Sequence, residues 1–162
     1  MAYPVQTVTT TKVATGPIVL RYGAAAGTTV SRVIEVTDID TGKTLYEHKG
    51  YNATGDKQTV ALFPIELGSG KVSVTVDELS VANMALGGEY TYVSISQAYM
   101  KTAASPNRSW EWYAAKAYIN MKSIKSNQDN PSTVTFDIIP YNDPGTAPWA
   151  FNADAACPPA NH

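Results

Sequence analysis

Few residues of the kinds that enzymes use for acid–base or nucleophilic chemistry occur among the 162 residues of this chain. It has two histidines, His48 and His162, and one cysteine, Cys157. A Ser–His–Asp triad would have to use one of these histidines, and no Gly-x-Ser-x-Gly sequence is present to carry its serine. Asp77 and Glu78 are adjacent, so in a strand their carboxylates point to opposite faces. The sequence therefore predicts a protein without catalytic activity.

Side chains that bind metals are equally scarce. Zinc sites are built mainly from Cys and His, of which this chain has too few. Asp38, Asp40 and Thr44 place oxygen atoms at alternating positions around Gly42, as a calcium loop would. The EF-hand pattern needs glycine at its sixth position and a carboxylate at its twelfth, and this segment does not have that spacing. An Asx turn that closes a hairpin is the preferred interpretation, and no metal or cofactor is expected.

Composition narrows the possible partners. Charged residues make up 16% of the chain, and the net charge is −2, whereas about one quarter of the residues in an average domain are charged. Without a basic patch, we do not expect binding to the phosphates of nucleic acids. Weakly charged surfaces are common where proteins pack against one another or bind neutral ligands. These are the two kinds of partner that we expect.

The sequence contains no evident targeting or membrane segment. No stretch approaches the roughly 18 consecutive apolar residues of a transmembrane helix. Residues 1–7 lack the charged and apolar regions of a signal peptide. The expected location is the cytoplasm at synthesis, with later release or incorporation into a particle left open. Cys157 cannot close a disulfide within the chain, and a disulfide between chains is left open.

Alternating apolar and polar residues predict β-strands along much of the chain. Three valines alternate with polar residues over 72–76, as in a half-buried strand. Strands are also predicted over 58–64, ending at Pro64, and over 133–141, where Pro140 marks the end. The clearest predicted hairpin pairs residues 30–36 with 44–47 through a turn at 38–43, where Gly42 would supply a positive φ. The predicted fold is an all-β, antiparallel β-sandwich of the jelly-roll or immunoglobulin-like kind.

The sandwich is expected over residues 17–141, as a single domain with an extended arm at each end. Residues 1–16 are rich in threonine and are predicted to form an N-terminal arm or an edge strand. Residues 142–162 are rich in proline, without periodicity, and are predicted to form an irregular C-terminal arm that carries Trp149 and Phe151. Extended arms can add strands to the sheet edges of neighbouring molecules.

Aromatic residues are concentrated between residues 89 and 118, which predicts an aromatic cluster. Over 109–125 the spacing fits a helix or a strand. The turn at 105–108 favours the return strand of a hairpin, and one helix is left open. In a strand, Trp110 and Trp112 lie on one face and Glu111 and Tyr113 on the other. Tryptophans can stack on sugars, lie at a lipid interface or fill the core, and we expect at least one in the core. A ligand-binding surface here would use Tyr90, Tyr92, Trp110, Trp112 and Tyr113.

Several short motifs follow one another in a recognisable order: Val33–Val36, Gly42–Leu45, Tyr51, Thr54-Gly55, Pro64, Gly70-Lys71, Val134–Phe136, Pro140–Asp143 and Trp149. This order resembles that of the actinoporin-like cytolysin and fungal fruit-body lectin superfamily. The resemblance implies a β-sandwich that binds phosphocholine headgroups or glycans, with headgroup contacts at Thr54, Pro140 and Tyr141. Two features differ from the family. The segment before Gly16 is not the amphipathic helix that its pore formers need, and residues 89–130 have no clear counterpart.

Two hypotheses about function follow from these observations. In the first, the chain is a non-catalytic structural subunit that assembles with itself through its terminal arms, as a homo-oligomer or larger particle. In the alternative, it is a lectin-like or cytolysin-like module that binds a glycan or lipid headgroup through its aromatic surface. Low charge and the two arms favour the first hypothesis.

Overall fold

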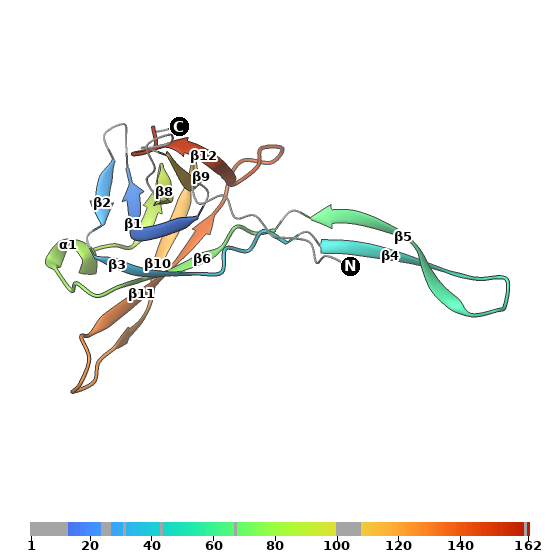
Figure 1. Cartoon of the computed structure of the whole chain (residues 1–162), viewed down its shortest axis with the longest axis horizontal. Helices are drawn as coiled ribbons and strands as arrows, with labels where there is room; N and C mark the ends of the chain where they lie inside the picture. The colour runs from blue at the N-terminus through green and yellow to red at the C-terminus, as the bar shows by residue number, and fades with distance from the viewer. Residues whose placement is uncertain are drawn as a thin grey trace, which may run out of the picture.

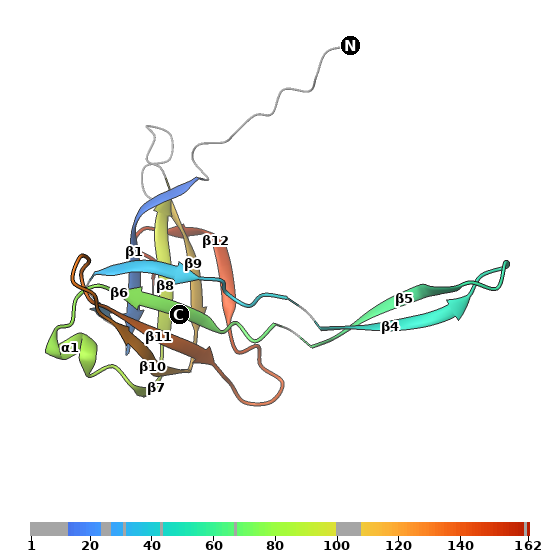
Figure 2. The same ribbon diagram turned by 90° about the horizontal axis from the view of Figure 1, so that it is seen from below.

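The computed structural model describes residues 13–23, 27–30, 32–42, 44–66, 68–99, 108–160 and 162. Within them the fold is an antiparallel β-sandwich from which one β-hairpin projects (Figures 1 and 2). The predicted all-β sandwich is confirmed. A single turn of helix, α1 (Val81–Met84), begins after Ser80, whose hydroxyl accepts a hydrogen bond from the Asn83 amide.

The sandwich consists of two five-stranded sheets. Sheet A has the order β12-β9-β8-β1-β2, and its strands are β12 (Ala150–Ala156), β9 (Arg108–Ala114), β8 (Val93–Tyr99), β1 (Ala14–Tyr22) and β2 (Thr28–Val30). Sheet B has the order β3-β6-β11-β10-β7, and its strands are β3 (Val33–Thr37), β6 (Val72–Val76), β11 (Thr133–Pro140), β10 (Ala117–Lys125) and β7 (Gly88–Tyr90).

The core lies between the two sheets and is built by the alternation that the sequence shows. On β6, the three valines are buried and the residues between them are half-buried, as predicted. Leu20, Ile95 and Trp112 enter the core from sheet A, and Phe136 and Ile138 enter it from sheet B. Strand β11 ends at Pro140, which confirms the predicted end of the 133–141 strand.

No helix forms over 109–125, so the helix that the sequence left open is absent. Strand β9 pairs with β8, which confirms the hairpin interpretation of this region. The chain then crosses between the sheets, because β10 belongs to sheet B and pairs with β11 and β7. Ala114 and Ala117 flank the crossing and are both buried.

The predicted hairpin of residues 30–36 with 44–47 is wrong. Strand β3 pairs with β6, with Val36 opposite Val74. The intervening chain forms a second, nested hairpin of β4 (Thr44–Tyr51) and β5 (Lys57–Glu66). Gly42 does not have a positive φ, and the glycine of the tight turn is Gly55, at φ 87°. Local turn chemistry at 38–43 suggested a return of the chain, but the return occurs fourteen residues later, at 52–56.

The nested β4–β5 hairpin, here called the arm, extends away from the sandwich (Figure 1). Its turn is closed by the Asn52 side chain, whose Oδ1 accepts hydrogen bonds from the amides of Thr54 and Asp56 at 3.0 and 2.8 Å. Pro64 was predicted to end a strand, but β5 continues to Glu66. Proline within sheets is confined mainly to edge strands, and β5 is such a strand because it pairs with β4 alone.

The C-terminal region is more regular than predicted. Residues 142–162 were expected to be irregular, yet Ala150–Ala156 form β12 at the edge of sheet A, with Phe151 opposite Trp112. The reason is that the prolines flank this seven-residue stretch and do not interrupt it. Of the predicted N-terminal arm, residues 1–12 lie outside the described residues. Residues 14–16 belong to β1, which is an inner strand of sheet A.

Candidate functional site

The arm exposes large apolar side chains along its length. Those that are at least half exposed are Leu45, Tyr46, Tyr51, Leu62 and Phe63. In the described part of the chain, β4 and β5 form a separate two-stranded sheet, and neither makes an extensive contact with another strand or with the helix. A two-stranded hairpin without a packed face is only marginally stable in water. The arm is therefore an element whose apolar surface has no cover within the described residues.

Both faces of the arm carry this apolar surface. Tyr46 lies opposite Phe63, so these two aromatic rings share one face. Leu62 lies opposite Glu47, and Leu45 is two residues before Glu47, so the two leucines share the other face. Sheets with one solvated face show apolar side chains on the other face only. Apolar side chains on both faces are typical of a strand pair that is covered from two sides.

The base of the arm, here called the neck, consists of residues 38–42 and 68–71. The Asp40 amide donates a hydrogen bond to the Lys71 carbonyl at 3.0 Å. The Asp40 carbonyl accepts one from the Gly70 amide at 2.7 Å. The Asp40 carboxylate accepts hydrogen bonds from the hydroxyl and amide of Ser69, at 2.6 and 3.2 Å, and these hydrogen bonds lower the pKa of Asp40. Asp40 therefore joins the two segments of the neck through both its backbone and its side chain.

Trp149 packs against the neck from the C-terminal part of the chain. Its Nε1 donates a hydrogen bond to the Gly68 carbonyl at 2.8 Å. Gly70 has φ 69°, and a Cβ on it would lie 2.2 Å from Trp149 Cδ1. Only glycine fits at this position, because the backbone conformation and the indole both exclude a side chain. The neck therefore fixes the arm to the sandwich through contacts from three parts of the chain.

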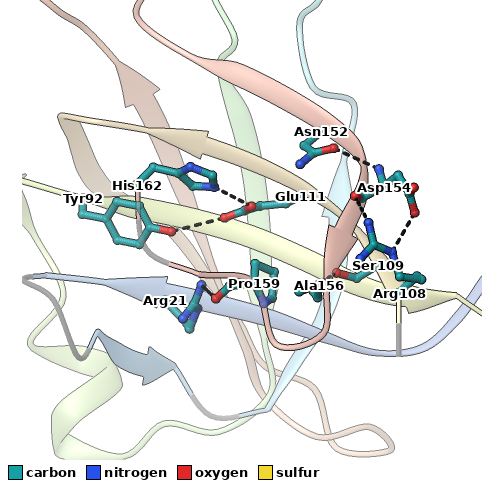
Figure 3. Close-up of polar contacts among 10 residues, drawn as sticks. All are labelled: Arg21, Tyr92, Arg108, Ser109, Glu111, Asn152, Asp154, Ala156, Pro159 and His162. Atoms are coloured by element: carbon teal, nitrogen blue, oxygen red, sulfur yellow. Dashed lines mark hydrogen bonds and ion pairs between the residues drawn. The ribbon is translucent and has the colours of Figure 1, made fainter. Parts of the chain in front are cut away.

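A second group of polar residues lies on the outer face of sheet A (Figure 3). Glu111 on β9 is fully buried; its Oε1 accepts the Tyr92 hydroxyl at 3.2 Å, and its Oε2 lies 2.9 Å from His162 Nε2. The His162 ring stacks on Tyr113, with centroids 3.8 Å apart. Arg21 donates to the Pro159 carbonyl at 2.8 Å. These contacts hold the segment after β12 against its own sheet, which explains how a carboxylate is buried there.

The five aromatic residues predicted to bind a ligand do not gather on one surface. Trp112 is fully buried in the core, and Trp110 packs against the core and stacks on Phe151. Tyr92 is buried beside Glu111, and its burial raises its pKa. Tyr90 packs edge-on against Tyr22, and Tyr113 stacks on His162. The predicted aromatic cluster is wrong, because Tyr90 lies on β7 in sheet B, Tyr92 lies between β7 and β8, and the side chains of β9 alternate between the two faces of sheet A.

The three residues that the family resemblance implied lie in two different places. Thr54 is exposed in the turn at the outer end of the arm, whereas Pro140 is the last residue of β11 in the sandwich and Tyr141 follows it. Figure 1 shows the arm extending away from the sandwich. Pro140 and Tyr141 line an open depression of 470 Å³, together with Gly68, Ser69, residues 142–146 and Pro148. Glu89 raises the pKa of the Tyr141 hydroxyl to about 12, so this hydroxyl remains a hydrogen-bond donor.

Sequence analysis missed the arm as a functional element, although a signal for it exists. Leu45-Tyr46 and Leu62-Phe63 are consecutive large apolar pairs. Consecutive side chains of a strand point to opposite faces, so each pair indicates a strand that is covered on both sides. Among the described residues, β4 and β5 pair with each other and with no further strand. That combination predicts a partner from outside the hairpin.

Comparisons with known proteins give no family for this chain: no protein-family model matches it, and no curated protein sequence does. The resemblance to the cytolysin and lectin superfamily therefore stays a prediction. Among the described residues, no group of three or more His, Cys, Asp or Glu side chains is placed to hold a metal ion. No helix in that part of the chain is long and apolar enough to span a membrane. The arm is the candidate site that the geometry supports best.

Proposed function

We propose that this protein is a non-catalytic structural subunit that assembles with copies of itself, and that the arm is its main assembly element. The observation that carries the proposal is the exposed apolar surface on both faces of the arm. Burial of apolar surface is the main driving force for protein association. Exposed apolar patches on a projecting element are typical of protein interfaces. The assembly element thus differs from the terminal arms favoured by the sequence.

Self-association is preferred to a charged partner because of the composition. The side chains of the arm that carry charge are of both signs, with Glu47 near Lys49 and Asp56 beside Lys57. The whole chain has a net charge of only −2. A surface of this kind offers little long-range attraction to a strongly charged partner. Apolar contact and strand pairing are the interactions that remain, and both can be supplied by another copy of the chain.

The test is the absolute mass in solution, measured by size-exclusion chromatography with light scattering. We expect the full chain to exceed its monomer mass of 17.4 kDa at micromolar concentration. A variant with Tyr46→Ser, Leu62→Ser and Phe63→Ser is expected to be monomeric and to keep the circular dichroism spectrum of the sandwich. These positions are exposed and make no contribution to the core, so the fold should survive.

A matched control removes exposed apolar side chains from the sandwich. Val81 and Ile124 are 88% and 52% exposed, so Val81→Ser with Ile124→Ser removes exposed apolar surface away from the arm. This control should assemble like the full chain. A full chain that stays monomeric up to high micromolar concentration overturns the proposal. Glycan arrays and liposome binding would then test the alternative, a module that binds a glycan or lipid headgroup, beginning with the depression beside Tyr141.

A further inference from the structure

The arm has two unpaired strand edges, and they differ in how regular their backbone is. The ladder between β4 and β5 shifts register twice, between Thr44 and Leu45 and between His48 and Lys49. At each shift the skipped residue belongs to β5, because β4 residues are consecutive while their partners jump from Glu66 to Pro64 and from Ala61 to Thr59. The edge of β5 is thus interrupted by two bulges and by a proline. The edge of β4 is continuous from Leu45 to Tyr51.

Continuous edges of this length are absent elsewhere in the described part of the fold. Strands β2 and β7 have three residues each, and β3 has five with a register shift. Strand β12 has seven residues, but its ladder with β9 shifts between Asn152 and Ala155. Bulges and short strands are common protections against edge-to-edge pairing. Strand β4 has neither, and it carries no proline, so its edge is the one most competent to pair.

The sequence of β4 is complementary to itself when it is read in the antiparallel direction about His48. Residues i and 96 − i then face each other across two copies, which places Glu47 opposite Lys49 of the second copy and Lys49 opposite Glu47 of the second copy. Leu45 faces Tyr51 of the second copy. Tyr46 faces Gly50 of the second copy, so its ring can cover a residue without a side chain. Opposite charges and apolar pairs at directly facing positions stabilise a sheet.

We propose that β4 pairs with β4 of a second copy around a two-fold axis at His48, which gives a four-stranded sheet of order β5-β4-β4-β5. This inference rests on the proposed self-assembly and specifies its contact and register. The side chains that it uses are available, since residues 45–49 and 51 are all exposed. Glu47 and Lys49 are each about half exposed and lie 3.5 Å apart within one chain. A two-fold contact uses the same surface on both copies, so the pairing closes on itself.

Neighbouring symmetric registers are disfavoured by charge. A two-fold axis at Glu47 would place this carboxylate directly opposite Glu47 of the second copy. A two-fold axis at Lys49 would place two ammonium groups opposite each other. Like charges at facing positions of a sheet destabilise the pairing. The register about His48 is therefore selected both by the pairs that it makes and by the pairs that it avoids.

Charge exchange tests this register. Glu47→Lys alone creates two facing Lys–Lys pairs in each interface, and Lys49→Glu alone creates two facing Glu–Glu pairs. Each single variant is expected to raise the dissociation constant of the dimer by about tenfold. The double variant Glu47→Lys with Lys49→Glu restores both opposite-charge pairs and is expected to return to within about threefold of the original value. Lys57→Glu, on β5 of the same arm, is the control and should have little effect.

Disulfide trapping tests the position of the axis. In a background of Cys157→Ser, His48→Cys would face itself across the axis, at the spacing of about 4.5–5.5 Å between Cα atoms that a sheet provides and a disulfide accepts. Tyr46→Cys would face Gly50 of the second copy and lie about 13 Å from its own counterpart. We expect rapid oxidation to a covalent dimer for His48→Cys and not for Tyr46→Cys.

The outcomes separate this inference from the proposed function. Assembly of the full chain without rescue by the charge exchange, or with equal trapping at positions 46 and 48, overturns the β4 pairing and leaves self-assembly intact. A monomeric full chain overturns both. Rescue together with selective trapping at position 48 supports the two-fold contact.

Discussion

The burial of Glu111 depends on residues that are far apart in the sequence. Its carboxylate is 1% exposed and meets Tyr92 from the segment before β8 and His162 from the segment after β12. Alternation along β9 correctly placed Glu111 on the face opposite the two tryptophans. It could not show what would cover this face, because the covering residue lies fifty-one positions away. Pairings of this length are set by the whole fold and leave no local pattern.

Removal of the His162 side chain should therefore lower the stability of the fold. His162→Ala leaves the buried carboxylate with the hydrogen bond from the Tyr92 hydroxyl but without the histidine, and we expect a loss of about 1–3 kcal/mol in the free energy of unfolding. Adding Glu111→Gln to that variant should recover part of the loss, since a neutral amide is less costly to bury. Urea denaturation of the three chains measures this. Equal stability of His162→Ala and the parent chain would contradict the anchoring role of His162.

Asp137 is expected to make the stability of the fold depend on pH in the acidic range. The Ser73 hydroxyl donates to its carboxylate at 2.5 Å, and Lys71 lies 3.5 Å away. The hydrogen bond from Ser73, followed by the charges of Lys71 and Lys122, lowers the pKa of Asp137 below its ordinary value. A carboxyl group whose pKa is lower in the folded state stabilises the fold above its unfolded pKa. That stabilisation is lost as the pH falls through the folded value.

Comparison with an amide isolates this effect. At pH 7, Asp137→Asn should be less stable than the parent chain by about 1–2 kcal/mol, the contribution of hydrogen bonds to a charged group. The difference should shrink below pH 4 and vanish once the Asp137 carboxyl is protonated in the folded state. Urea denaturation at pH 7, 5, 4 and 3 measures it. A difference that does not change with pH would show that the charge of Asp137 is not the cause.

At the scale of elements, the neck determines where the arm points. Gly68 allows segment 68–71 to approach segment 38–42, and Gly70 allows it to approach Trp149. The sequence identified turn residues in both segments but paired the wrong strands across them. Turn signals report where a chain can bend, and they do not distinguish one short hairpin from two nested ones. The nested arrangement is favoured by the pairing of β3 with β6, which buries Val74 and Val76 in the core.

Gly70→Ala tests the neck. The new methyl group would combine a strained φ with a clash against Trp149, and we expect a loss of about 2–4 kcal/mol in stability. Gly145→Ala is the matched control. Gly145 also has a positive φ, of 90°, but a Cβ there would meet nothing within 4 Å. It should show the backbone cost alone, about 1 kcal/mol. Thermal unfolding monitored by tryptophan fluorescence measures both, and equal losses would contradict the packing argument.

At the scale of the whole molecule, periodicity predicted the sandwich well and the arm poorly. Strands such as β6 and β11 alternate because each is covered on one side by a core that belongs to the same chain. The arm has no such layer among the described residues, so its apolar residues follow a different pattern, in consecutive pairs. A pattern that depends on a surface outside the hairpin cannot be interpreted from the hairpin alone.

The nesting of the arm inside the β3–β6 hairpin also makes it separable. Its two ends meet at the neck, where Asp40 and Gly70 are joined by a backbone hydrogen bond, and none of its described side chains belongs to the core of the sandwich. Such a segment can be lengthened, shortened or exchanged while β3 and β6 keep their register. Substitutions in the arm and substitutions in the sandwich would then change different properties. Natural variation or engineering could thus change the length or surface of the arm without disturbing the folding of the sandwich.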